Sequence, residues 1–226
     1  RIVMLNPALK TSQKNAILTD IGVNFLITDQ DFLSLENLNN LGYVDDNVSQ
    51  ALTLTLTSGS SGKPKAVVHA VADHLANAKG VCELMGFSHT DSWLLSLPLF
   101  HVSGQGIVWR WLLQGATLQI CEDKCDFMDG LDVVSHASLV PTQLQRYLEQ
   151  LKQPLDKQKS ILLGGAFIPP ELVELAKKRN IVTFSGYGMT EMASTICAGR
   201  SESHNVGYPL LGREVRLVNQ EIWVKG

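Results

Sequence analysis

The alternation of strand-like and helix-like segments between Trp93 and Phe184 is the feature that most constrains the fold of this chain. Short apolar runs typical of buried strands alternate here with longer stretches typical of helices. Strands that alternate with helices favour an α/β fold with a largely parallel sheet. We therefore predict mostly parallel sheets flanked by helices, with strands at 93–97, 117–121, 135–140, 160–163 and 181–184 and helices at 105–113, 141–151 and 169–179.

The two ends of the chain carry different patterns. Asp73 can cap a helix that ends at Gly86, and residues 214–218 and 221–224 predict a β-hairpin around Asn219-Gln220. We expect an α/β core over residues 1–205, incomplete at its N-terminus, and the start of a small β-subdomain over residues 206–226. Because the chain opens without methionine and stops just after its last strand begins, we also expect it to be a piece of a larger protein.

Composition excludes several classes of function. The chain has 226 residues, of which 45% are hydrophobic, and a formal net charge of -3. This weak negative charge gives no electrostatic footprint for nucleic acid. No apolar run approaches the roughly 20 residues of a membrane helix, and the N-terminus shows no signal-peptide pattern. The four cysteines lack metal-site spacing and favour free thiols, so we expect a cytoplasmic protein.

A glycine- and serine-rich stretch, Thr57–Lys65, follows the alternating run Leu52–Leu56 and precedes a second apolar run. Glycines let a backbone approach an anion, hydroxyl groups add donors, and lysines add charge, so the stretch predicts a phosphate-binding loop. A flexible linker is the alternative. The stretch is not a Walker A loop, because only two residues separate Gly59 from Gly62 and proline follows Lys63.

Two further loops follow predicted strands, Gly164–Ala166 and Gly186–Glu191. Ligands of open parallel sheets bind at the carboxyl ends of the strands, where we place both loops together with Thr57–Lys65. In the last loop, Tyr187 offers a ring for stacking on a base and Thr190 a hydroxyl for a phosphate. A carboxylate beside phosphates is repelled unless a cation lies between the two groups, so we predict that Glu191 is a Mg²⁺ ligand. An ordinary turn with a helix-capping threonine is the alternative.

Five stretches of the sequence resemble the motifs of the adenylate-forming acyl-CoA synthetase superfamily, and they follow one another in the family's order. In the last of the five, Gln220 stands where the family usually has glycine. Three longer stretches, 100–111, 137–144 and 187–195, resemble the bacterial o-succinylbenzoate–CoA ligases of menaquinone synthesis. The five stretches are Thr57–Lys65, Pro98-Leu99-Phe100-His101, Leu162-Leu163-Gly164-Gly165-Ala166, Tyr187-Gly188-Met189-Thr190-Glu191 and Gln220-Glu221-Ile222-Trp223-Val224-Lys225-Gly226.

The resemblance implies two half-reactions with ATP, Mg²⁺ and CoA as co-substrate: adenylation of the succinyl carboxylate, then displacement of AMP by the CoA thiol. It implies catalytic roles for Lys65, Thr190, Glu191 and His101, with Glu191 on the metal. It also implies a C-terminal lid domain that this chain lacks, so we expect the chain alone to be inactive. The implied ATP-binding residues are Thr57, Ser58, Gly59, Ser60, Ser61, Gly62, Lys65, Gly164, Gly165, Ala166, Gly186, Tyr187, Gly188, Met189 and Thr190, and the implied acyl-pocket residues are His101, Ser103 and Arg110.

We predict a role for Arg110 in substrate binding from the chemistry of the implied acid, o-succinylbenzoate. o-Succinylbenzoate carries a second, aromatic carboxylate that stays an anion and needs a cationic partner in a partly apolar pocket. Arg110 lies between Trp109 and Trp111, close after the His101 loop. The alternative is that its stem packs on a tryptophan while its head points to solvent. For His101 the alternative is a core histidine hydrogen-bonded to backbone.

Other functions stay open from the sequence alone. The chain could belong to another acyl-CoA synthetase, to an adenylation domain for a different acid, or to a non-catalytic nucleotide-binding module. The predicted partners are small molecules, without nucleic acid or a membrane span, and homo-oligomer formation is left open.

Overall fold

The computed structural model describes residues 2–23, 26–28, 51–57, 65–121, 126–201 and 205–226. The chain divides into two compact units, Arg1–Val71 and Ala72–Gly226. Within the described residues, no helix is both long enough and apolar enough to cross a bilayer.

The first unit contains helix α1, Thr11–Asp20, and a three-stranded sheet in the order β1-β2-β3. Strand β1 (Ile2–Val3) runs parallel to β2 (Leu52–Thr57), and β2 runs antiparallel to β3 (Lys65–Ala70). The predicted phosphate-binding stretch therefore joins an antiparallel pair in a small separate sheet, and our placement of it in the parallel sheet was wrong. A local strand pattern cannot show which sheet a strand enters.

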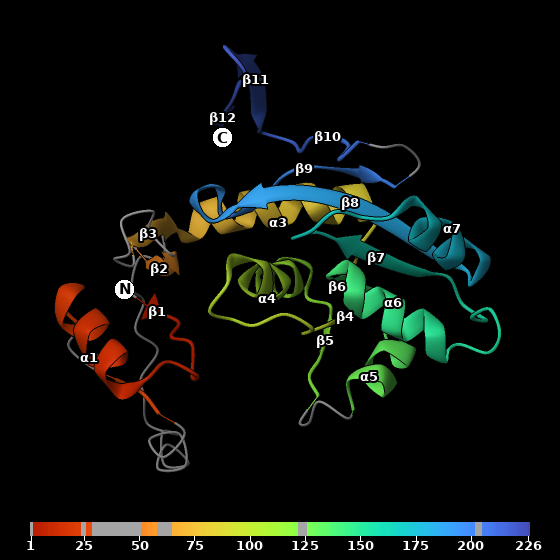
Figure 1. The fold of residues 1–226 in the computed structure, drawn as a ribbon, viewed down its shortest axis with the longest axis horizontal. Helices are drawn as coiled ribbons and strands as arrows, with labels where there is room; N and C mark the ends of the chain where they lie inside the picture. The colour runs from red at the N-terminus through yellow and green to blue at the C-terminus, as the bar shows by residue number, and fades with distance from the viewer. Residues whose placement is uncertain (1, 24–25, 29–50, 58–64, 122–125, 202–204) are drawn as a thin grey trace. The chain divides into compact units, whose positions relative to one another are not determined.

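The second unit is built on a seven-stranded sheet in the order β10-β9-β8-β7-β6-β4-β5 (Figure 1). In the sheet, the five neighbouring strands β5, β4, β6, β7 and β8 pair in parallel. Strand β9 pairs antiparallel with β8, and β10 pairs antiparallel with β9. This arrangement confirms the predicted α/β fold. The strands are β4 (Ser92–Leu94), β5 (Thr117–Gln119), β6 (His136–Leu139), β7 (Lys159–Leu163), β8 (Ile181–Met189), β9 (Ser194–Arg200) and β10 (Tyr208–Pro209).

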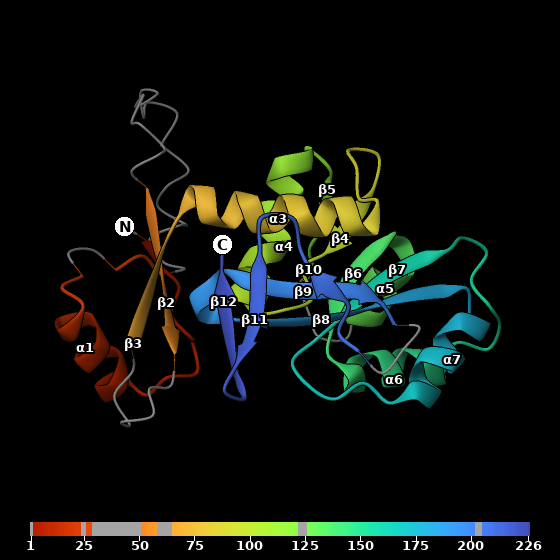
Figure 2. The same cartoon turned by 90° about the horizontal axis from the view of Figure 1, so that it is seen from above.

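Helices cover both faces of this sheet (Figure 2). On one face, Leu162 and Phe184 pack with residues of α3 and α4. On the other face, Ile161 and Leu163 pack with residues of α5, α6 and α7. Neighbouring residues of a strand point to opposite faces, so two separate cores form. The helices are α3 (Val71–Met85), α4 (Val102–Gln114), α5 (Phe127–Val133), α6 (Pro141–Gln150) and α7 (Pro170–Lys178).

Strand β8 continues past the predicted end at Phe184 as far as Met189. The predicted loop over residues 186–189 is therefore wrong, because β9 pairs with this extension through an irregularity at Tyr187/Gly188. A single turn of 3₁₀-helix, Thr190–Met192, connects the two strands. The local sequence of the glycine-containing extension of β8 predicts a turn, but pairing with β9 stabilises it as a strand.

The predicted hairpin near the C-terminus is confirmed as β11 (Glu214–Val218) and β12 (Glu221–Lys225), which form a sheet of their own (Figure 1). Its turn residues Asn219 and Gln220 have φ angles of 48° and 68°, as a tight hairpin requires. Gln220 thus occupies a conformation that glycine adopts most readily. The boundary that we place before residue 206 stays a prediction, and β10 within that range pairs with β9.

Candidate active site

A pocket of about 290 Å³ opens in the second unit, where helix α4 meets the carboxyl ends of β6, β7 and the extended β8. This is the edge of a parallel sheet at which ligands are expected. It brings together most of the predicted acyl-pocket and nucleotide-binding residues. Those that line it are His101, Ser103, Arg110, Gly164, Gly165, Gly186, Tyr187, Gly188, Met189 and Thr190.

The start of helix α4 positions His101 and Ser103. The His101 carbonyl accepts hydrogen bonds from the backbone N–H groups of Gly104 and Gln105, both at 3.1 Å. The Gln105 side chain donates to the Leu99 carbonyl at 3.0 Å and so fixes the preceding loop. His101 itself is exposed and lines the pocket, which contradicts the core-histidine alternative.

Arg110 lies two turns further along α4, on the face that carries Ser103, and is only 1% exposed. Its Nη1 donates to Ser138 Oγ at 3.2 Å, and its Cζ lies 4.8 Å from the centre of the Trp93 ring. Its Nε finds no acceptor among the described residues. Burial lowers the pKa of Arg110 to about 10, so the guanidinium remains charged at neutral pH. The head of Arg110 thus borders the pocket and does not point to solvent.

The turn that carries Thr190 and Glu191 is strained and held from two sides. Ala193 and Ser194 adopt positive φ angles of 53° and 110°, which are unfavourable for residues other than glycine. Asn77 of α3 donates from Nδ2 to the Thr195 carbonyl at 2.6 Å. Backbone strain of this kind persists only where surrounding contacts fix it, and it often marks functional sites.

Two further contacts fix the same turn. Arg213 Nη2 donates to the Met192 carbonyl at 3.0 Å. Gly188 allows the two strands to approach, because a Cβ at position 188 would lie 2.0 Å from the Ser194 carbonyl oxygen. These contacts fix the backbone of the turn from which the Thr190 and Glu191 side chains project.

Glu191 is exposed at this turn and does not line the pocket itself. No lysine or arginine of the described residues forms an ion pair with it. Those residues also contain no group of three or more His, Cys, Asp or Glu side chains that could hold a metal ion. A lone carboxylate fits Mg²⁺, which proteins commonly bind through one or two carboxylates together with substrate phosphates.

Some predicted site residues lie elsewhere. Ala166 lines a separate cavity of about 270 Å³ with Phe167 and Glu174. Thr57 and Lys65 face each other at the open end of the β2–β3 pair in the first unit, and Lys65 is exposed. Residues 58–64, which include Ser58, Gly59, Ser60, Ser61 and Gly62, lie outside the described part of the chain. A joint site between Lys65 and the pocket therefore stays a prediction.

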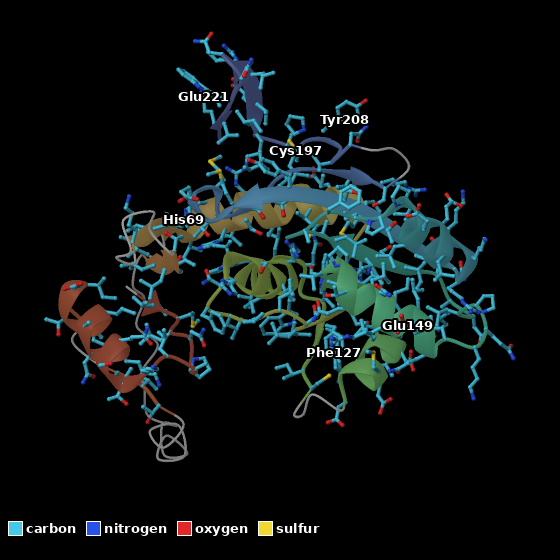
Figure 3. All side chains as sticks on the ribbon, in the orientation of Figure 1. His69, Phe127, Glu149, Cys197, Tyr208 and Glu221 are labelled. Atoms are coloured by element: carbon cyan, nitrogen blue, oxygen red, sulfur yellow. The ribbon has the colours of Figure 1, made fainter. Side chains whose placement is uncertain are left out.

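Tyr187 also borders an apolar cavity of about 220 Å³ on the side of the β11–β12 hairpin. Cys197 of β9, labelled in Figure 3, is the strand partner of Tyr187. It lines this cavity together with hairpin residues. Nearby, Tyr208 of β10 is 82% exposed. The extension of β8 thus separates a partly polar pocket from an apolar one.

Several residues in or beside the pocket had no predicted role. Ser138 and Trp93 contact the Arg110 guanidinium, and Ser194 lines the pocket beside the strained turn. Ser138 could have been found from its place near the carboxyl end of a predicted strand, the edge where we expected ligands. The sequence around Trp93 predicts only a core residue. Its contact with Arg110 could not be predicted, because that contact joins a strand to a helix that begins nine residues later.

Comparison with known proteins identifies the group to which these features belong. The model of a protein family described as AMP-binding enzyme matches residues 44–225. The chain belongs to this family. Membership confirms the resemblance to adenylate-forming enzymes seen in the sequence motifs.

Relatives of this AMP-binding chain are similar over its whole length. The 2-succinylbenzoate–CoA ligase of Haemophilus influenzae is 51% identical over 230 residues, which cover all of this chain and 50% of the relative. The 2-succinylbenzoate–CoA ligase of Escherichia coli is 44% identical over 235 residues, covering all of this chain and 51% of the relative. The chain thus spans about half the length of these curated relatives.

A solved structure of o-succinylbenzoate coenzyme A synthetase from Bacillus subtilis, in complex with ATP and magnesium ion, is also similar. It matches with a TM-score of 0.83 and 27% identity, over 99% of this chain and 55% of that one. An Escherichia coli enzyme with a bound analogue matches with a TM-score of 0.69 and 52% identity, over 76% of this chain and 38% of that one.

Proposed function

We propose that this chain forms the nucleotide- and acid-binding part of an o-succinylbenzoate–CoA ligase. The ligase would adenylate the succinyl carboxylate with ATP and then transfer the acyl group to CoA. The names of the relatives support this proposal. The observation that carries it is Arg110, a buried guanidinium that borders the pocket and donates to Ser138 but to no carboxylate of the described residues.

A buried charge without a counter-ion is costly, so an anionic ligand would complete this site. The aromatic carboxylate of o-succinylbenzoate would provide that charge while the succinyl carboxylate reacts. Charge-assisted hydrogen bonds from arginine to carboxylate are among the stronger polar contacts in proteins. A neutral acyl chain would leave the guanidinium unpaired, which favours a diacid over a fatty acid.

In the first half-reaction the succinyl carboxylate attacks the α-phosphorus of ATP, which gives the acyl-adenylate and releases pyrophosphate. Attack of one anion on another is slow unless charge is neutralised and the groups are aligned. Thr190 would donate its hydroxyl to the α-phosphate, and Lys65 and the loop that precedes it would hold the β- and γ-phosphates. Glu191 would hold Mg²⁺, which neutralises phosphate charge when it is bound.

In the second half-reaction the CoA thiol attacks the acyl-adenylate and AMP leaves. His101 would stand where the thiol enters, because it is exposed and lines the pocket. The proposal includes a C-terminal lid domain, a cytoplasmic location and a place in menaquinone synthesis. We expect the 226-residue chain alone to be inactive in thioester formation.

Exchange between ATP and labelled pyrophosphate, catalysed by the full-length enzyme, tests the choice of acid. The panel comprises o-succinylbenzoate, 4-oxo-4-phenylbutanoate (the same acid without the aromatic carboxylate), benzoate and a medium-chain fatty acid. We expect exchange with o-succinylbenzoate to exceed that with each other acid. Faster exchange with the fatty acid would instead support another acyl-CoA synthetase.

The Glu191→Ala variant of the full-length enzyme separates a ligase from a nucleotide-binding module without catalysis. A ligase would show acid-dependent exchange that the substitution abolishes. A binding module would show no exchange in either form, although it would still bind ATP in a calorimetric titration.

A further inference from the structure

The guanidinium of Arg110 is held by three neighbours that come from different elements. Trp93 of β4 provides the aromatic ring, with Arg110 Cζ 4.8 Å from the ring centre. Trp93 is itself fully buried, so the ring cannot move aside. A cation over a buried ring is attracted by the ring quadrupole, and the contact holds the guanidinium over the ring.

Ser138 of β6 holds one nitrogen of the guanidinium. Its Oγ accepts the Arg110 Nη1 hydrogen bond at 3.2 Å. Its backbone carbonyl accepts a hydrogen bond from Ser96 Oγ, which ties the end of β6 to the segment after β4. Ser138 is buried and lines the pocket, so its hydroxyl is placed by the sheet and not by solvent.

Gly106 of α4 provides space for the guanidinium. It lies one helical turn before Arg110, and a Cβ at this position would be 3.0 Å from Arg110 Nη2 and 3.7 Å from Ser194 Oγ. Its φ angle is not positive, so the backbone does not require glycine here. Glycine inside a helix costs roughly 0.5–1 kcal/mol relative to alanine. The missing side chain therefore leaves room for the arginine head between α4 and the strained turn.

We propose that Gly106 and Ser138 are positioning residues that set the acid specificity of the pocket by holding the Arg110 guanidinium against Trp93. Neither residue needs to touch the substrate. Ser138 leaves the other donors of Arg110 available for a carboxylate, and Gly106 keeps the charged head from being displaced along the helix. The inference rests on the proposed function, because it assigns Arg110 the aromatic carboxylate of a diacid.

The Gly106→Ala variant of the full-length enzyme tests this arrangement. A methyl group at this position would shift the guanidinium, and we expect kcat/KM for o-succinylbenzoate to fall by about tenfold, the equivalent of about 1.4 kcal/mol. The loss should come from KM for the acid, with KM for ATP unchanged, and should be much smaller for 4-oxo-4-phenylbutanoate. The melting temperature should stay the same or rise, because alanine favours the helix.

A second variant and a control make the test decisive. Ser138→Ala removes the hydroxyl acceptor without adding volume, and it should lower the preference for the diacid in the same way. If Gly106→Ala does not fold, Ser138→Ala decides the question. The control is Gly80→Ala in α3, another buried helical glycine, where the added Cβ would meet Leu210 Cβ at 3.1 Å. This control should not change the preference between the two acids.

Arg110→Met, measured beside these variants, distinguishes the two possible failures. If Arg110→Met removes the diacid preference while Gly106→Ala and Ser138→Ala leave it intact, the positioning role is overturned and the proposed function stands. If Arg110→Met leaves the preference unchanged, the pairing of Arg110 with the aromatic carboxylate is wrong, whereas the choice of acid is tested by the panel above. A parallel loss of preference in all three variants, with the control unchanged, would support the inference.

Discussion

Arg110 of α4 and Lys159 of β7 are two buried cations that lie near opposite ends of the parallel strands. They differ in the groups that surround their charge. Arg110 is 1% exposed and Lys159 is 3% exposed. Arg110 borders the pocket near the carboxyl ends of the strands, whereas Lys159 is the first residue of β7 and lines none of the three cavities described above. Burial therefore does not tell a functional cation from a structural one.

The ammonium group of Lys159 interacts with a backbone carbonyl and with a carboxylate of the same domain. Its Nζ donates to the Val134 carbonyl. Burial lowers the pKa of Lys159 to about 8, and the negative charge of Asp132 opposes this shift. Asp132 in turn accepts a hydrogen bond from the Tyr147 hydroxyl at 2.7 Å. Among the described residues, the guanidinium of Arg110 donates one hydrogen bond, to the Ser138 hydroxyl, and its Nε has no acceptor, which leaves donors for a ligand. Unused donors beside a cavity, more than burial, indicate a binding site.

The strongest contrast is expected when each cation is replaced by methionine in the full-length enzyme. Arg110→Met should lower kcat/KM for o-succinylbenzoate by at least about 30-fold, because loss of a buried charged partner costs about 2–5 kcal/mol. Lys159→Met should keep adenylation within about twofold of the parent. Steady-state pyrophosphate exchange measures both. Equal losses in the two variants would show that the contrast is wrong.

The pH dependence of stability should separate Lys159 from Arg110, because the pKa of Arg110 is lowered only to about 10. The pKa of Lys159, about 8 in the folded state, lies below the ordinary value of 10.5. The unfolded state therefore binds more protons between these values, and stability rises with pH across that window. Relative to Lys159→Met, the parent should gain about 1–3 kcal/mol between pH 8 and 10.5. Urea unfolding across this range measures the difference, and parallel curves would contradict a buried, charged Lys159.

Exchanging the two kinds of cation is expected to have intermediate effects. Arg110→Lys keeps a charge but loses the planar fork and the guanidinium contact with Trp93, so kcat/KM for the diacid should fall about tenfold. Lys159→Arg places a larger head in a closed site and should destabilise the fold by about 1–3 kcal/mol without changing the acid preference. Kinetics and thermal unfolding of both variants check this. An Arg110→Lys enzyme with full activity would show that only the charge matters.

The smallest effect is expected from the support of Lys159. Tyr147→Phe removes the hydroxyl that donates to Asp132 and should cost about 1 kcal/mol of stability. Activity should not change, because Tyr147 lies in the core between α6 and the sheet. Chemical unfolding and pyrophosphate exchange on the same samples measure both quantities. A loss of activity would mean that this end of the sheet also supports the site.

The sequence predicted those parts of the fold whose signals are local. Helix α6, with proline at its start, and the β11–β12 hairpin match their expected ranges within a few residues. The extension of β8 was missed because it depends on pairing with β9. The same limit holds at the site. The position of Arg110 was open between pocket and solvent, since Trp93 and Ser138, which hold it, come from other strands.

We propose above that Arg110 forms a prepared site for the second carboxylate of a diacid. The most direct test measures kcat/KM for o-succinylbenzoate and for 4-oxo-4-phenylbutanoate, each with the parent enzyme and with Arg110→Met. We expect a coupling of at least about 2 kcal/mol between the carboxylate and the guanidinium, so that the diacid loses far more than the monoacid. Equal losses for the two acids would contradict it.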